Sequence, residues 1–132
     1  MMCVVLGASS GLGRRVAERL ASAGATLVLA SSDLRDVEAE ASDLSLRYGV
    51  RARAARVDLA AAALDLRQLD SAVDELGPVD AVVVTAGEFS DRDSFPAGRA
   101  TAEGLLRVNL LSILLFVEHI VPRMRRDSVI VG

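Results

Sequence analysis

The sequence contains no lysine and no tryptophan, and aromatic residues make up only 3% of its 132 residues. Arginine therefore supplies all 15 basic side chains, against 18 acidic ones. The resulting net charge of −3 argues against a nucleic-acid partner, because such proteins present a basic field. The single cysteine, Cys3, excludes an internal disulfide and favours a reducing compartment, so we expect a cytoplasmic protein.

Long apolar runs are also absent from the sequence. The most apolar stretch, residues 110–117, is interrupted by Ser112 and is much shorter than the roughly 20 residues of a membrane-spanning helix. The N-terminal apolar run ends after Leu6 and has no basic residues before it, unlike a signal peptide. We therefore predict no membrane segment and one globular domain over residues 1–132.

Short apolar runs alternate with longer, helix-length segments along the chain. The expected strands are residues 3–6, 26–30, 54–59, 81–84 and 129–131, and the expected helices are 12–23, 33–48, 64–76 and 99–124. Runs without polar alternation are typical of parallel strands that are covered on both faces. The pattern predicts a three-layer α/β fold with a parallel sheet of about five strands.

A glycine-rich segment connects the first strand to the first helix. Gly7, Gly11 and Gly13 have the spacing G-x-x-x-G-x-G, which is not a P-loop because that motif needs a lysine. Backbone N–H groups and the helix N-terminus at such a turn can bind a pyrophosphate, and a tight structural turn is the alternative. The residues expected to hold the pyrophosphate are Gly7, Ser9, Ser10, Gly11, Leu12 and Gly13.

Three further motifs follow this glycine segment in a fixed order, and together they resemble the short-chain dehydrogenase/reductase family. Gly7, Gly11 and Gly13 match its TGxxxGxG loop, with Leu6 in place of the usual threonine. Asp58-Leu59 resembles the pair that contacts adenine, and Thr85-Ala86-Gly87 resembles the end of the NNAG motif. Asn109 matches the asparagine of the catalytic tetrad.

The resemblance implies a Rossmann-like sheet with strand order 3-2-1-4-5 and a nicotinamide dinucleotide across its carboxyl edge. Asp58 and Leu59 would flank adenine, Ala86 and Gly87 would line the cofactor path, and Asn109 would be a catalytic residue. Simpler interpretations stay open at this point: Asp58 as the cap of a turn, and Asn109 as a satisfied polar residue on an apolar helix.

The end of the second strand bears on the choice between NAD and NADP. The family register places Ser31 where an acidic residue binds the ribose in NAD-dependent members, and Ser32 where NADP-dependent members often have arginine. This favours NADP over NAD. Asp33, 20 residues after Gly13, could instead bind the ribose or cap the following helix.

The catalytic tyrosine and lysine of the family have no counterpart in this sequence. The only tyrosine, Tyr48, is not followed by a basic residue four positions later, and residues 129–131 resemble the fifth strand, after which the family places its catalytic serine. We expect the cofactor-binding part of an oxidoreductase, incomplete at its C-terminus and inactive alone. A non-catalytic dinucleotide-binding module or sensor is the alternative.

The segment 99–124 is apolar on nearly all sides, so we expect it to form a homo-oligomer interface. A dimerising interaction protein without cofactor is therefore a third hypothesis. No metal site is predicted. We expect His119 to be a solvated helix residue without a partner, and Cys3 to be an inert core residue.

Overall fold

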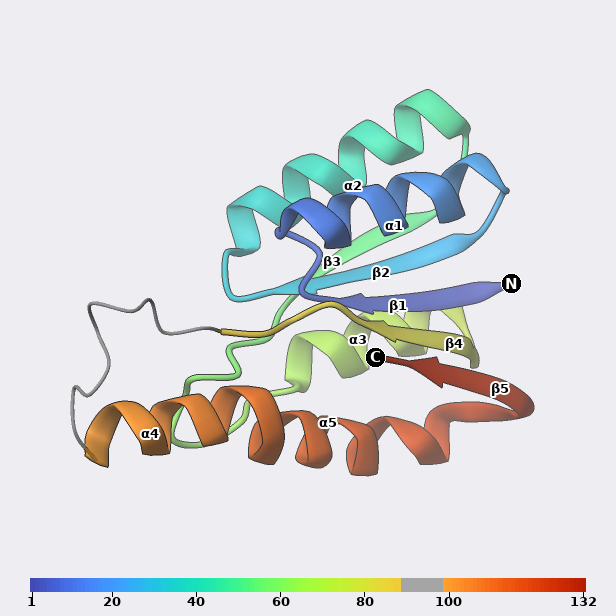
Figure 1. Ribbon diagram of the computed structural model, residues 1–132. Helices are drawn as coiled ribbons and strands as arrows, with labels where there is room; N and C mark the ends of the chain where they lie inside the picture. The colour runs from blue at the N-terminus through green and yellow to red at the C-terminus, as the bar shows by residue number, and fades with distance from the viewer. Residues whose placement is uncertain (89–98) are drawn as a thin grey trace.

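The computed structural model describes residues 1–88 and 99–132. Within these residues, five strands form one parallel sheet in the order β3-β2-β1-β4-β5, which confirms the predicted order (Figure 1). The elements are β1 (Met2–Leu6), α1 (Gly11–Ser22), β2 (Thr26–Ser31), α2 (Leu34–Tyr48), β3 (Ala52–Arg56), α3 (Arg67–Leu76), β4 (Val79–Val84), α4 (Arg99–Leu106), the π-helical turn η1 (Arg107–Leu111), α5 (Ser112–Ile120), the 3₁₀ turn η2 (Val121–Arg123) and β5 (Met124–Val131).

Helices cover both faces of the sheet, as the continuous apolar strands predict. Figure 1 shows α1 and α2 on one face, and α3 with α4 and α5 on the other. Leu29 and Leu44 belong to the core under α1 and α2, and Leu69 and Phe116 belong to the core on the opposite face. The described residues therefore form the predicted three-layer Rossmann-like fold.

The helix α2 begins and ends at residues that the sequence indicates. Asp33 is its N-cap, and its carboxylate accepts a hydrogen bond from the Asp36 N–H at 3.2 Å. Gly49 ends the helix with a φ of 67°, a left-handed conformation that costs glycine little. This start places Ser31 and Ser32 at the carboxyl end of β2, immediately before the cap.

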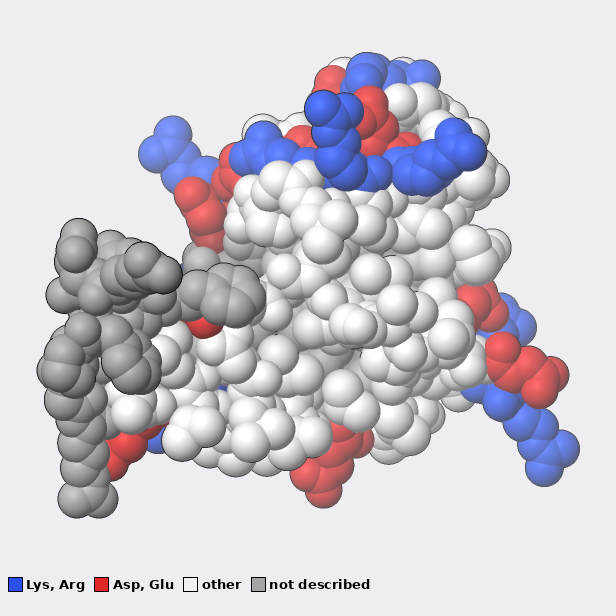
Figure 2. Space-filling view, viewed as in Figure 1, with Lys and Arg blue, Asp and Glu red and all other residues white. Residues whose placement is uncertain are grey.

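The single helix predicted over residues 99–124 is divided into α4, η1, α5 and η2. Only one side of this helical stretch packs against the sheet, through Val108, Phe116 and Ile120. The opposite side exposes apolar side chains, with Leu106 at 61% and Leu114 at 57%. Figure 2 shows charged side chains gathered over α1 and α2 and at the start of β5, whereas the surface over α5 and the end of β5 in the same view is largely uncharged.

The same stretch bears on the prediction that the chain has no membrane segment. Ala102–Arg123 is a helical stretch of 22 residues, long and apolar enough to span a bilayer, whereas the sequence argument considered residues 110–117 alone. Core helices of α/β proteins pass the same test of length and composition. Because one side of this stretch lies on the sheet, its length is weak evidence for a membrane protein.

Several further boundaries differ from the prediction. The strand β3 covers Ala52–Arg56 instead of residues 54–59, so Asp58 and Leu59 follow the strand, and β4 begins at Val79 instead of Ala81. The helix α3 begins at Arg67 instead of Leu64, because the Asp65 carboxylate accepts hydrogen bonds from the Arg67 backbone and guanidinium and holds a turn there. The strand β5 begins at Met124, opposite Val79, and its register shifts between Val79 and Ala81. Residues 125–128 of this strand are polar, so apolar runs in the sequence do not indicate its first half.

Candidate functional site

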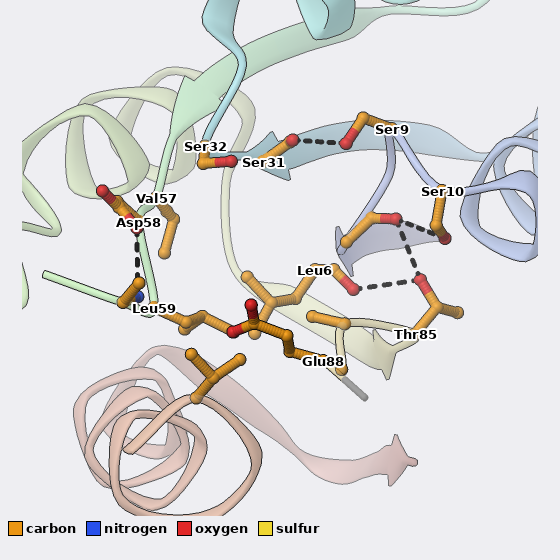
Figure 3. Close-up of a pocket in the computed structure, with 15 residues that line it drawn as sticks. Leu6, Ser9, Ser10, Ser31, Ser32, Val57, Asp58, Leu59, Thr85 and Glu88 are labelled. Carbon is orange, nitrogen blue, oxygen red and sulfur yellow. Dashed lines mark hydrogen bonds between the residues drawn. The ribbon is translucent and has the colours of Figure 1, made fainter. Parts of the chain in front are cut away.

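A cavity of about 360 Å³ lies at the carboxyl ends of the central strands (Figure 3). It is lined by Leu6, Gly7, Ser9, Ser10, Ser31, Ser32, Val57, Asp58, Leu59, Ala60, Thr85, Ala86, Gly87, Glu88 and Val108. Nine of the twelve residues predicted to bind the cofactor are in this lining. In parallel α/β sheets, ligands bind in the crevice beyond this edge, so the cavity is the candidate site.

The glycine turn closes the sheet end of the cavity. Gly7 has a φ of 91°, and a Cβ added to it would lie 2.5 Å from the Ala86 backbone nitrogen. Ser10 caps α1: its Oγ accepts from the Gly13 N–H and donates to the Gly7 carbonyl oxygen, both at 2.9 Å. The turn therefore brings the start of α1 against the ends of β1 and β4.

The three predicted residues outside the lining are Gly11, Leu12 and Gly13. A Cβ on Gly13 would lie 2.1 Å from the Gly7 carbonyl oxygen, so Gly13 allows α1 to pack closely on the turn. A Cβ on Gly11 would meet nothing within 4 Å, and Leu12 is 65% exposed. Gly13 thus has a packing role, and Gly11 leaves open space at the helix N-terminus.

The end of β2 contributes two hydroxyl groups. Ser31 is buried, and its Oγ lies 2.6 Å from the Ser9 Oγ of the glycine turn. Ser32 is exposed and also lines the cavity. Asp33 is absent from the lining and uses its carboxylate to cap α2, which confirms the capping interpretation of this residue.

The segment after β3 forms a second wall. The Asp58 carboxylate accepts from the Ala60 N–H at 3.0 Å, so this residue caps a turn and also lines the cavity. The Arg56 guanidinium lies 3.5 Å from the same carboxylate. Leu59 is buried, and its carbonyl oxygen accepts a 2.6 Å hydrogen bond from the Ser112 hydroxyl of α5.

The segment after β4 is fixed by Thr85 and Asn109. The Thr85 hydroxyl is 3.1 Å from the carbonyl oxygens of both Leu6 and Gly7. The Asn109 carboxamide accepts from the Glu88 N–H at 2.9 Å and donates to the Glu88 carbonyl oxygen at 2.7 Å. Asn109 itself does not line the cavity. Its two hydrogen bonds hold the backbone of Glu88, which does line it.

Sequence reasoning did not assign several lining residues to the cofactor. Leu6 and Thr85 belong to the motifs quoted from the sequence, and like Val57 they stand at strand ends that the sheet topology could have indicated. Tertiary contacts bring Glu88 and Val108 into the cavity lining, so no local sequence pattern indicates them. Figure 3 shows the Glu88 carboxylate directed toward Leu59 inside the cavity.

The lining contains two acidic residues, Asp58 and Glu88, and no basic residue. A bound phosphate would therefore depend on backbone N–H groups of the glycine turn and on the dipole of α1. Within the described part of the chain, no group of three or more histidine, cysteine or acidic residues could hold a metal ion. The hydrogen-bond donors of the site are neutral groups, so the site suits an organic anion better than a metal ion.

Three residues considered in the sequence analysis, Tyr48, His119 and Cys3, lie outside the cavity. The Tyr48 hydroxyl donates to Glu18 at 3.2 Å between α2 and α1, outside the cavity. His119 Nε2 lies 2.8 Å from the Asp70 carboxylate of α3, so the expectation that it has no partner is wrong. Cys3 is fully buried in β1, and burial raises the pKa of its thiol, as an inert core residue requires.

Comparisons with known proteins agree with this architecture. The family model described as short chain dehydrogenase matches residues 1–131. The chain is 28% identical over 125 residues to 3-oxoacyl-acyl-carrier-protein reductase FabG of Aquifex aeolicus, covering 92% of this chain and 49% of that protein. It is 30% identical to 3-dehydrosphinganine reductase TSC10A of Arabidopsis thaliana, covering 92% of this chain and 36% of that protein.

Two solved structures show the same fold. A Serratia marcescens short-chain dehydrogenase/reductase mutant has a TM-score of 0.83 at 26% identity, covering 98% of this chain and 53% of its own. L-sorbose reductase of Gluconobacter frateurii, complexed with NADPH and L-sorbose, has a TM-score of 0.81 at 26% identity, covering 98% and 50%. The chain spans about half the length of these two proteins and of FabG. It belongs to the short-chain dehydrogenase/reductase family.

Proposed function

We propose that this chain binds a nicotinamide dinucleotide and forms the cofactor-binding part of an oxidoreductase that interconverts carbonyl and alcohol groups. The observation that carries the proposal is the convergence of four strand ends, with nine predicted cofactor residues, on one cavity. When bound, the cofactor supplies the hydride for that chemistry. The relatives of this chain include a reductase, and one of the similar solved structures is an NADPH complex.

The residues present fit such a cofactor. The glycines keep the turn compact and open: a side chain at Gly7 or Gly13 would collide with backbone, and Gly11 keeps the helix N-terminus accessible. Gly7, Ser9, Ser10, Gly11, Leu12 and Gly13 would hold the pyrophosphate, and Ser31 and Ser32 the adenosine ribose. Asp58 and Leu59 would flank adenine, and Ala86 and Gly87 would lie along the cofactor.

We propose NADP(H) as the preferred form. Ser31 replaces the carboxylate that would repel a 2′-phosphate, and the Ser32 hydroxyl can donate a hydrogen bond to it. Asn109 holds Glu88 at the end of the cofactor path and stands where the family has its tetrad asparagine. We propose that hydride transfer needs a tyrosine followed four positions later by a lysine, a pair that this chain does not contain, so the chain alone binds cofactor without catalysis.

A titration with NADPH and NADH, followed by nucleotide fluorescence, tests this proposal. Gly11→Asp should abolish binding, because its carboxylate would occupy the place of the pyrophosphate. The same carboxylate at a helix N-terminus should not reduce stability, and a Cβ meets nothing within 4 Å there. Gly104→Asp is the matched control, since a Cβ at Gly104 is equally unobstructed and this residue is not in the lining.

We also propose that the chain is cytoplasmic and self-associates through its α4–α5 surface. The apolar side chains on this surface are Leu106, Leu110, Leu111, Leu114 and Leu115. An exposed apolar patch of this kind is typical of an interface. Sedimentation analysis of Leu114→Glu tests it, because a charge in the centre of the patch should shift the protein toward the monomer.

A further inference from the structure

A guanidinium group lies against the glycine turn at Ser9, whose hydroxyl contacts Ser31 at the end of β2, although the guanidinium does not line the cavity. Arg14 follows the glycine turn, in the first turns of α1. Its Nε donates to the Ser9 carbonyl oxygen at 3.2 Å, and the Ser9 Oγ lies 2.6 Å from the Ser31 Oγ. Two consecutive contacts thus connect Arg14 to the place proposed for the adenosine ribose.

Arg14 is held there by an acidic residue of α2. Its Nη2 lies 2.5 Å from the Asp36 Oδ1, while the Asp36 Oδ2 is buried and has no hydrogen-bond partner among the described residues. The Arg14 side chain is 46% exposed. A guanidinium has five N–H donors, and these contacts use Nε and one Nη2 donor, so others can meet an incoming anion.

A cation at this corner is chemically needed if the cofactor carries a 2′-phosphate. The lining contains acidic residues and no basic residue, and serine hydroxyls donate hydrogen bonds without charge. Arg56 is another cation near the lining, but it lies on the Asp58 carboxylate, on the side proposed for adenine. Arg14 instead contacts Ser9, whose hydroxyl meets that of Ser31.

We propose that Arg14 selects the 2′-phosphorylated dinucleotide, and that Asp36 holds its guanidinium in place when no phosphate is bound. A planar guanidinium beside the ribose can donate two charge-assisted hydrogen bonds to a phosphate. This inference rests on the proposed cofactor function and adds the charge that Ser31 and Ser32 lack. It assigns a specificity role to Arg14 and no part in the reaction itself.

Dissociation constants for NADPH and NADH, measured on the whole chain and its variants, test this assignment. Arg14→Gln should weaken NADPH about tenfold, the effect of losing a charge-assisted hydrogen bond, and should leave NADH unchanged. Asp36→Asn should strengthen NADPH relative to NADH, because it removes the competing carboxylate. Arg14→Gln should weaken the binding of adenosine 2′,5′-bisphosphate as it weakens that of NADPH. It should leave the binding of adenosine 5′-monophosphate unchanged.

Arg53→Gln is the matched control, because Arg53 is 47% exposed and pairs with Glu75 at 2.5 Å outside the cavity. Equal weakening of NADPH and NADH by Arg14→Gln would overturn the proposal and leave Arg14 as a support for the glycine turn. Unchanged NADPH binding would overturn it too. If Arg14→Gln does not fold, the Asp36→Asn variant tests the proposal. A ratio of NADPH to NADH dissociation constants that equals that of the unaltered chain would then contradict it. Failure of the unaltered chain to bind either cofactor would instead contradict the proposed function.

Discussion

Two sides of the molecule differ in how completely the sheet is covered. On the covered side, all residues of β1, and all but the first residue of β2, are buried between helix layers. On the exposed side, the edge strand β5 (Figure 1) exposes Val129 at 52% and Val131 at 51%, and the neighbouring α4–α5 surface exposes leucines. The glycine turn and the two serines at the end of β2, Ser31 and Ser32, belong to the covered side.

This difference indicates that the cofactor site and the apolar surface serve separate purposes. The cavity lies at the ends of strands that are buried between two helix layers, and hydrogen bonds from Ser10 and Thr85 hold its glycine turn. An exposed apolar strand edge beside an exposed apolar helix is a template for pairing with another surface. Stability should therefore be concentrated in the covered side, and association in the exposed side.

The largest effect is expected from removing core volume on the covered side. Leu29→Ala in β2 removes a fully buried side chain and should lower the free energy of unfolding by about 2–5 kcal/mol. Ile130→Ala in β5, where the side chain is 38% exposed, should cost about 1 kcal/mol or less. Urea unfolding of both variants measures the contrast, and equal losses would show that β5 is covered in solution.

The next largest effect separates two glycines of one turn. Gly13→Ala should destabilise the protein strongly, because its Cβ would lie 2.1 Å from the Gly7 carbonyl oxygen and must displace the backbone. Gly11→Ala should leave stability unchanged or slightly raised, because its Cβ is unobstructed and alanine favours the helix. Thermal unfolding compares them; a stable Gly13→Ala variant would contradict the close packing of α1 on the turn.

A smaller effect is expected where the two sides meet, at the Asn109 clamp. Asn109→Ala removes both hydrogen bonds to the Glu88 backbone and should cost about 1–2 kcal/mol. Amide hydrogen exchange at Glu88 should become faster in the same variant. Asn109→Asp keeps the acceptor for the Glu88 N–H and loses the donor, so exchange at Glu88 should stay slow in it.

The smallest effect concerns the surface between α1 and α2, and it depends on pH. Hydrogen bonds from Arg47 and Tyr48 lower the pKa of Glu18 below its ordinary value of 4.5. A carboxylate with a lowered pKa contributes stability above that value and loses the contribution as the pH falls. Arg47→Gln should therefore flatten the decline in melting temperature below pH 5, and an unchanged acid profile would contradict the pairing.

Local sequence patterns predict the parallel strands and the glycine turn, whereas the sheet order and most of the predicted cavity residues follow from the resemblance to the family. Apolar runs locate the strands, and the strand–glycine–helix sequence locates the turn at Gly7. The rest depends on contacts between distant residues: Asn109 positions Glu88 from 21 residues away, and Val79 pairs with Met124 to extend β5. Neither contact leaves a periodic signal, so Glu88 and the polar start of β5 were missed.

The burial of Cys3 has a practical consequence for following the motions of this molecule. It is the one thiol in the sequence, it is fully buried, and it lies in a strand with a neighbour on each side. A thiol reagent can reach it only when the central strand opens, so the labelling rate reports the opening equilibrium of the sheet. Slower labelling in the presence of NADPH would measure how tightly ligand binding couples to that opening, without any engineered probe.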